Sequence, residues 1–347
     1  MILVTGGAGY IGSHTTVVLQ EAGYEVLVVD NLSNSDAGVM DRIEKITGKR
    51  PVFEEMDLVD AAKVDALFAK YSIEGIIHFA ASKAVGESVQ KPLLYYRNNL
   101  QSLMNLLDAM KKYEVKNIVF SSSCTVYGQP AEEYLPVTEN APIQVALSPY
   151  GNTKQICEEI LRDSIYAHPE LQGVALRYFN PVGAHPSALI GELPIGVPQN
   201  LMPFITQTGM GLRQGLKVFG GDYSTPDGTC IRDYIHVMDL AKAHLIALER
   251  YMKGNNKKGF EWFNLGTGTG SSVLEVIKSF EKMSGKKLPY EIVDRREGDI
   301  EQIWAETTIA NEELGWKSEL GLDEMTDSAW KWEKYYNEVL KPSISEA

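Results

Sequence analysis

The chain has 347 residues, of which 44% are hydrophobic and 23% are charged, a composition typical of globular proteins rather than disordered or fibrous ones. Its formal net charge of −13 and its pI near 5.0 disfavour non-specific binding to nucleic acid, which requires a basic surface. The apolar runs are short, as at residues 26–29, so no membrane span of about 20 residues can be placed.

Strand-like and helix-like segments alternate through the first half of the chain. We expect strands at 2–5, 25–30, 52–55, 75–81, 117–123 and 173–179, and helices at 10–23, 36–47, 60–71, 92–113 and 148–167. Repeated units of this length predict an α/β fold, a doubly wound, Rossmann-type parallel sheet with helices on both faces. We assign residues 1–180 to this first domain.

The alternation ends after Asn180. Residues 181–230 are rich in proline and glycine and predict loops with short elements, which commonly hold a ligand on a rigid scaffold. Helices are predicted further along, at 239–252, 271–284 and 322–340. We therefore expect 181–347 to form a smaller, mixed α/β substrate domain, with some segments returning to the first domain.

The run TGGAGYIG at 5–12 follows the first predicted strand and opens the first helix. Glycines are needed there because the backbone must turn sharply and approach a pyrophosphate, which then meets free N–H groups at the helix N-terminus. Asp30 follows 18 residues after Gly12, at the end of the next strand. A carboxylate in that place accepts hydrogen bonds from the ribose of NAD and repels the 2′-phosphate of NADP. The pattern predicts an NAD site.

A second glycine run, GTGTGS at 266–271, lacks the GK[ST] ending of a phosphate-binding loop. We expect it to be a structural turn, with Ser271 capping the helix that follows.

Tyr150 and Lys154 lie one turn apart on a predicted helix, a spacing that chance alone produces in a chain this rich in both residues. A nicotinamide cofactor gives the pair a function, because oxidising an alcohol requires a base for its proton. Lowering a phenol pKa from about 10 to about 7 requires ~4 kcal/mol. One ammonium about 5 Å away supplies roughly 3 kcal/mol at an effective dielectric of about 20, and the positive nicotinamide ring can supply the rest.

The run SSSCTVYG at 121–128 ends a predicted strand at the carboxyl edge of the sheet, where ligands bind in this architecture. A serine hydroxyl there can hydrogen-bond the reacting oxygen and help to move its proton.

Together these motifs resemble the extended short-chain dehydrogenase/reductase family and, within it, the family of UDP-galactose 4-epimerases. The resemblance covers nearly the whole chain. It is carried by VTGGAGYIGSHT, DNLSNS, HFAASKAVGESVQKPL, FSSSCTVYG, SPYGNTK, LRYFNPVGAHPS, NLMP, RDYIHVMDLA, FNLGTGTG and RREGD. It implies a homodimeric enzyme that interconverts UDP-galactose and UDP-glucose by NAD-dependent oxidation at carbon 4, through a 4-keto sugar. The NAD would be tightly held and regenerated in each turnover.

The resemblance also implies roles position by position. The implied catalytic residues are Ser123, the base Tyr150 and its activating lysine Lys154. The residues implied to bind NAD are Gly6, Gly9, Tyr10, Ile11, Asp30, Asn31, Asp57, Leu58, Phe79, Ala80, Lys83, Asn98, Tyr150, Lys154, Tyr178 and Phe179. Those implied to bind the UDP-sugar are Ser123, Asn180, Asn200, Leu201, Phe219, Arg232, Tyr234, Arg296 and Asp299. The two arginines would supply the local cations that an acidic protein needs for a diphosphate.

Residue 303 departs from the family pattern. The resemblance makes bulk at this position decisive for N-acetylated sugars, and Ile303 is neither the tyrosine of strict enzymes nor the small residue of permissive ones. Activity on UDP-GlcNAc or UDP-GalNAc therefore stays open. An epimerase of UDP-glucuronate or UDP-arabinose is also compatible with the same motifs.

A dehydratase and a non-catalytic sensor are the two rival functions on this fold. A nucleotide-sugar 4,6-dehydratase shares the oxidation but needs an acid and a base, and Cys124 and Thr125 stand where related dehydratases have Asp-Glu. A non-catalytic NAD-binding sensor could share the fold, but intact Ser123, Tyr150 and Lys154 disfavour it.

The cysteines and histidines predict a reducing compartment and no metal. Cys124, Cys157 and Cys230 lack C-x-x-C spacing, and the histidines show no metal-ligand spacing. The residues after Met1 do not form the basic and apolar pattern of a secretory signal. We therefore expect a cytoplasmic protein that binds neither a membrane nor nucleic acid.

Overall fold

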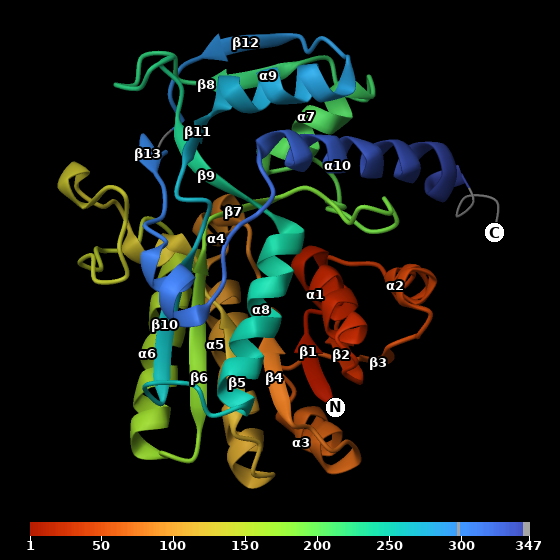
Figure 1. The fold of residues 1–347 in the computed structure, drawn as a ribbon, viewed down its shortest axis with the longest axis vertical. Helices are drawn as coiled ribbons and strands as arrows, with labels where there is room; N and C mark the ends of the chain where they lie inside the picture. The colour runs from red at the N-terminus through yellow and green to blue at the C-terminus, as the bar shows by residue number, and fades with distance from the viewer. Residues whose placement is uncertain (297–298, 343–347) are drawn as a thin grey trace.

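The computed structural model describes residues 1–296 and 299–342. A seven-stranded sheet forms its lower half in Figure 1, in the order β10-β6-β5-β4-β1-β2-β3. All neighbouring strands in this sheet are parallel, which confirms the predicted doubly wound fold. The strands are β1 (Ile2–Thr5), β2 (Val26–Asp30), β3 (Val52–Glu55), β4 (Gly75–His78), β5 (Asn117–Ser121), β6 (Gln172–Tyr178) and β10 (Phe260–Leu265).

Helices cover both faces of the sheet and bury one apolar cluster on each. One cluster joins the sheet to α1 (Tyr10–Glu21), α2 (Val39–Thr47) and α8 (Val237–Met252). The other joins it to α3 (Ala61–Lys70), α5 (Pro92–Lys112) and α6 (Pro149–Ala167). The inner strands β1, β2, β4 and β5 are buried on both faces, as parallel strands between two helical layers must be, whereas the edge strand β3 is partly exposed. A short helix, α4 (Val85–Gln90), lies before α5 and was not predicted.

The second part of the chain lies beyond the carboxyl ends of the parallel strands, in the upper half of Figure 1. Its strands are β7 (Asn180–Val182), β9 (Ile231–His236), β11 (Gly270–Ser272) and β13 (Gln302–Ile303), with the pair β8 (Leu216–Phe219) and β12 (Tyr290–Val293). Its helices are α7 (Leu201–Gly209), α9 (Val273–Ser284) and α10 (Leu322–Tyr335). Short helical turns occur at Cys124–Tyr127, Glu132–Tyr134, Ala310–Leu314 and Tyr336–Leu340. A third apolar cluster joins β7, β8, β9, α7, α9 and α10.

Two elements from beyond residue 180 join the first sheet. β10 pairs with β6 at the sheet edge, and α8 packs on the face that also carries α1. The division of function between 1–180 and 181–347 stays a prediction.

The prediction that Ser271 caps the next helix is wrong by one residue. Ser271 pairs with Arg232 between β11 and β9, so the strand still includes it. Ser272 is the cap instead: its hydroxyl accepts from the backbone N–H of Glu275, whose carboxylate accepts from the N–H of Ser272. This reciprocal pair is a capping box.

The second glycine run binds a carboxylate of the protein itself. Asp233, fully buried in β9, accepts hydrogen bonds from the N–H groups of Thr267 at 2.8 Å and Gly268 at 3.1 Å. A Cβ on Gly266 would lie 2.3 Å from the carboxylate of Asp233. The run is therefore a structural turn built around this acid.

No helix in the described ranges is long and apolar enough to cross a membrane.

Candidate active site

The loop between β1 and α1 has no room for side chains at two of its glycines. A Cβ on Gly6, whose φ is +68°, would lie 2.7 Å from the backbone nitrogen of Ala80, and a Cβ on Gly12 would lie 2.3 Å from the carbonyl oxygen of Gly6. Gly9 begins α1 and provides no side-chain cap. The N–H groups of the first turn, at Tyr10 and Ile11, are therefore placed to bind a phosphate.

The predicted adenosine-binding residues lie at the ends of β2 and β3. The carboxylate of Asp30 accepts from the N–H of Ala8, within the glycine loop, at 3.1 Å. The side chain of Asn31 donates to the carboxylate of Asp57 at 3.1 Å. Leu58 is buried in the cluster beneath them. The Asp30 carboxylate also accepts from the N–H of Leu32 at 2.9 Å and from the hydroxyl of Ser35 at 2.8 Å. A carboxylate has about four acceptor sites, so one remains for a ribose hydroxyl.

Other predicted cofactor residues lie where β4 and β6 end. The ring of Phe79 packs 4.6 Å from that of His244, and Tyr178 packs 5.9 Å from the same ring. Phe79 and Ala80 adjoin Gly6. Asn98, on α5, donates to the hydroxyl of Ser82 at 3.1 Å. Phe179 is buried in a small apolar cluster next to β6.

These positions fit a dinucleotide. The glycine loop closes against the end of β4 at distances that exclude side chains, the acid at the end of β2 lies against that loop, and the start of α1 lacks a side-chain cap. The fit rests on this close backbone approach, as the pyrophosphate requires.

The helix α6 brings Tyr150 and Lys154 to the end of β5. Ser148 caps the helix by accepting from the N–H of Gly151 at 3.1 Å, and Pro149 occupies its first position. The Lys154 ammonium lies 5.8 Å from the centre of the Tyr150 ring. It donates to the carbonyl oxygen of Ser121 at 2.6 Å.

Burial has the largest effect on the pKa values of Tyr150 and Lys154. It lowers the pKa of Lys154 from 10.5 to about 8, against the opposing effects of Cys157 and Glu158. It raises the pKa of the Tyr150 phenol well above 10, and a hydrogen bond with Ser123 only partly offsets this. Desolvation is therefore the largest effect on the pKa of Tyr150, and the net shift is opposite to the lowering expected from Lys154.

Ser123 lies at the end of β5, where it caps the turn Cys124–Tyr127 by accepting from the N–H of Thr125 at 3.2 Å. It is 8% exposed. The structure thus brings Ser123, Tyr150 and Lys154 together at the carboxyl edge of the sheet.

The predicted diphosphate residues gather on a second group of strands. Asp299 accepts from Arg232 and from Arg296, each at 3.1 Å. The guanidinium of Arg296 lies 5.7 Å from the ring of Phe219, at the end of β8. One carboxylate therefore orients two guanidinium groups, of which Arg296 is exposed. Glu297 and Gly298 of the RREGD motif lie outside the described residues.

Two further predicted residues connect this group to the parallel sheet. Asn180 begins β7 directly after Phe179, and it pairs with Tyr234 of β9. Tyr234 is buried, and burial raises the pKa of its phenol to about 12.

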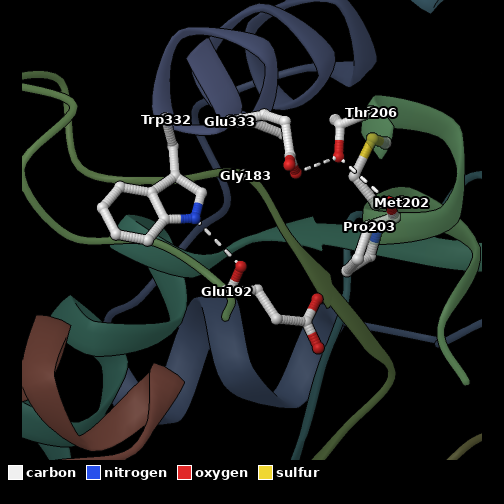
Figure 2. A pocket seen from close by; sticks show the side chains of 8 residues that line it. Gly183, Glu192, Met202, Pro203, Thr206, Trp332 and Glu333 are labelled. Carbon is white, nitrogen blue, oxygen red and sulfur yellow. Dashed lines mark hydrogen bonds between the residues drawn. The ribbon is translucent and has the colours of Figure 1, made fainter. Parts of the chain in front are cut away.

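Asn200 and Leu201 lie at the start of α7. The side chain of Asn200 donates to the carboxylate of Glu192 at 2.6 Å, and the same oxygen of Glu192 lies 4.0 Å from the ammonium of Lys83. Figure 2 shows Glu192 in a small pocket beside α10, where its carbonyl oxygen accepts from Trp332 at 2.9 Å. Glu192 therefore joins a predicted cofactor residue to a predicted substrate residue, and no sequence pattern indicated it.

Ile303 lies on β13, beside Arg232 of β9. It is 2% exposed and packs in a cluster with Val126 and Phe179. The residue at the predicted specificity position is thus in the core that supports the site.

Sequence reasoning also missed a buried ion pair behind the catalytic residues. Arg177, on β6, forms two hydrogen bonds with Glu158, on α6. Glu158 comes one turn after Lys154 on the buried side of the same helix. That spacing was a usable signal, because an acid on a buried helix face needs a partner.

Comparison with known proteins decides the family. Residues 3–329 match the model of the family described as GDP-mannose 4,6 dehydratase. The chain is 55% identical over 332 residues to the UDP-glucose 4-epimerase of Bacillus subtilis, with 96% of each chain covered. The chain belongs to the UDP-glucose 4-epimerase family.

Solved structures of this family match both parts of the chain. The UDP-glucose 4-epimerase of Stenotrophomonas maltophila, with bound NAD and formylated UDP-arabinopyranose, has a TM-score of 0.93 at 48% identity, over 97% of this chain and 98% of that one. The enzyme from Bifidobacterium longum, in complex with NAD+ and UDP, has a TM-score of 0.92 at 49% identity, over the same shares. NAD is thus a ligand of family members whose fold this chain shares over nearly its full length.

Proposed function

We propose that this protein interconverts UDP-galactose and UDP-glucose by reversible, NAD-dependent oxidation at carbon 4 through a 4-keto sugar. The observation that carries the proposal is the convergence of Ser123, Tyr150 and Lys154 at the same carboxyl edge of the sheet as a glycine loop without room for side chains. The identity to UDP-glucose 4-epimerases over nearly the whole chain supports the choice of reaction.

The catalytic residues move one proton. Tyr150 takes the proton of the 4-hydroxyl as phenolate, directly or through Ser123, and returns it after the sugar has turned. Ser123 hydrogen-bonds the reacting oxygen from the end of β5. Lys154 stabilises the phenolate with its positive charge, while its hydrogen bond to Ser121 holds the ammonium in place.

The proposed cofactor residues would hold NAD next to Ser123, Tyr150 and Lys154. Bound NAD would supply the hydride acceptor and donor for carbon 4, and its positive ring would favour the phenolate of Tyr150. The first turn of α1 would bind the pyrophosphate, and Asp30 and Asn31 the adenosine ribose. Phe79, Ala80, Lys83, Asn98, Tyr178 and Phe179 would line the remainder, with Asp57 and Leu58 beside the adenine.

The second group of residues anchors UDP while the sugar turns. Arg232 and Arg296 would bind the diphosphate, because guanidinium groups match phosphate oxygens in pairs. Asp299 accepts hydrogen bonds from both guanidinium groups and so orients them before UDP binds. The start of α7, at Asn200 and Leu201, would add backbone donors. Asn180, Phe219 and Tyr234 complete the proposed nucleotide-sugar site.

A dehydratase would lack its acid and base in this site. Cys124 and Thr125 occupy the positions after Ser123, and burial raises the pKa of the Cys124 thiol to about 12, so it stays protonated at neutral pH. The Thr125 hydroxyl is buried without a hydrogen-bond partner among the described residues. Neither group replaces a carboxyl pair.

We also propose a homodimer and a cytoplasmic location. Several apolar side chains on α4 and α5 are exposed, namely Val85, Val89, Leu93, Leu94 and Met104. An apolar face of this kind fits a second copy of the chain, so Leu93→Asp should shift the mass measured by light scattering from dimer to monomer. The three cysteines are free, in keeping with a reducing compartment.

Tyr150→Phe tests the proposed function. We expect the turnover number for UDP-galactose to fall by about 10²-fold to 10⁴-fold, the usual contribution of a positioned acid-base group, with NAD content and UDP affinity unchanged. Tyr166→Phe, on the exposed side of the same helix, is the matched control and should keep full activity. Full activity in Tyr150→Phe would contradict the assignment. A panel with UDP-GlcNAc, UDP-glucuronate and UDP-arabinose would define the substrate.

A further inference from the structure

A buried ion pair holds both ends of the segment that carries the proposed catalytic serine. At the start of this segment, 122–127, the hydroxyl of Ser122 donates to Glu158 at 2.5 Å. At its end, the hydroxyl of Tyr127 accepts from Arg177 at 3.0 Å. Arg177 and Glu158 are themselves joined by two hydrogen bonds, at 3.0 and 2.5 Å. One rigid unit therefore fixes the segment at two points.

The position of this pair follows from strand alternation. Ala175 and Arg177 point to the α6 side of β6, whereas Leu176 and Tyr178 point to the α8 side. Arg177 therefore meets α6 one turn beyond Lys154, where Glu158 lies. Both partners are enclosed, at 5% and 8% exposure.

Tyr127 is also held by a residue outside the ion pair. Its hydroxyl donates to the side chain of Asn264, on β10, at 2.6 Å, and its ring lies 5.1 Å from the guanidinium of Arg177. Asn264 in turn donates to the carbonyl oxygen of Val137 at 2.8 Å. The segment is thus tied to α6, β6 and β10 together.

Stability alone is a weak reason for such a pair. A buried ion pair loses much of its attraction to desolvation, and well-packed apolar residues are often as stabilising. The ion pair differs from apolar packing in its geometric specificity, because two parallel hydrogen bonds fix both the angle and the distance between α6 and β6.

We propose that Glu158 and Arg177 form a positioning pair that fixes the Ser123 hydroxyl against Tyr150 by holding both ends of the segment 122–127. This role rests on the proposed epimerase function. A displacement of about 1 Å in a reacting group can cost about 100-fold in rate, so the pair acts on turnover while substrate binding is unchanged.

A double-mutant cycle tests the pair in the NAD-loaded enzyme. Ser122→Ala and Glu158→Gln are each made with Ser123 intact and in a Ser123→Ala background, and kcat and KM for UDP-galactose are measured. Ser122→Ala removes one tie and leaves the ion pair whole, so it carries the test if Glu158→Gln does not fold. Glu261→Gln is the control.

The control disrupts a matched ion pair elsewhere. Glu261 and Arg250 also form two hydrogen bonds, at 2.9 and 3.0 Å, and their side chains are 8% and 9% exposed. Glu261 lies near the start of β10, whereas Asn264, which contacts Tyr127, lies near its end. A thermal unfolding curve for each variant measures the stability cost of losing either pair.

The proposal predicts a ~10-fold to 100-fold fall in kcat with KM unchanged when Ser123 is present, and a fall of less than about threefold in the Ser123→Ala background. Glu261→Gln should lower the unfolding temperature and keep kcat. An equal fall in both backgrounds, or no fall, would overturn the proposal. Failure of the epimerase function itself would show separately, as a wild-type protein that does not convert UDP-galactose.

Discussion

The ammonium of Lys154 is buried, and burial disfavours its charged form. Burial lowers its pKa to about 8, which corresponds to roughly 3 kcal/mol of stability lost in the ammonium form relative to the unfolded chain. The protein retains this charge where Tyr150 needs it. This is the trade of stability for activity that functional sites commonly show.

Replacing this lysine should therefore stabilise the protein. Lys154→Met should raise the free energy of unfolding at pH 7 by up to ~3 kcal/mol and abolish the activity. The folded pKa lies below the unfolded one, so wild-type stability rises as pH increases from about 8 towards 10.5, and the gap to the variant should narrow by about 1 kcal/mol between pH 7 and pH 9.

Urea unfolding at the two pH values measures this, with Lys63→Met, at an exposed position, as the control. A Lys154→Met variant less stable than wild type at both pH values would refute the account of the buried charge.

The motifs predicted which residues form the candidate site, but they could not predict the contacts of these residues. The spacing of Tyr150 and Lys154 placed them on one helix face, as the structure has them. It could not show that Lys154 donates to the carbonyl oxygen of Ser121, on β5, or that desolvation raises the pKa of Tyr150. Both depend on burial, which local sequence does not determine.

At the scale of elements, adjacent serines at the start of α9 show how a distant contact decides a helix boundary. Ser271 and Ser272 are both good N-caps by sequence. Pairing of β11 with β9 extends through Ser272, so the helix begins only at Val273, and the last strand residue, Ser272, is the cap. Similarly, the short β7 and β8 could not be located in the loop-rich run 181–230, because their partners lie far away in sequence.

This boundary gives a direct prediction. Ser272→Ala should lower the free energy of unfolding by about 1 to 2 kcal/mol, because it removes the capping box and the hydrogen bond to Asp227 at 2.5 Å. Ser271→Ala should stay within about 0.5 kcal/mol of wild type. Chemical denaturation of both variants would decide the assignment, and equal losses would contradict it.

For the whole molecule, the alternating half of the sequence predicted the parallel sheet. We expected segments of the later half to return to the first domain, but the sequence did not show which ones. β10 lies next to β6, and α8 next to α1, although both follow residue 230. Only long-range packing decides such a placement. One proposed substrate residue, Asn180, lies directly after β6 and Phe179, at the start of β7, which pairs with β9 of the second part.

Four buried histidines predict that the protein loses stability in acid. Burial lowers the pKa of His14 and His78 to about 3 and that of His236 and His244 to about 4. Below pH 6.5 the unfolded chain binds protons that the folded protein does not, so stability falls with pH, by about 2 kcal/mol per histidine at pH 5.

His244→Leu tests this, since Nε2 of His244 has no hydrogen-bond partner among the described residues. The variant should lose about 2 kcal/mol less than wild type between pH 7 and pH 5 in chemical unfolding. An unchanged pH dependence would show that His244 does not contribute.

The central claim, oxidation and reduction at the same carbon within one site, has a direct measurement. UDP-galactose carrying deuterium at carbon 4 is converted by the wild-type protein, and the UDP-glucose formed is analysed by mass spectrometry and NMR. We expect the deuterium to remain at carbon 4, because the hydrogen removed from one face returns to the other without exchange. Loss of the label to water, or its transfer to another carbon as in elimination, would contradict the proposed reaction.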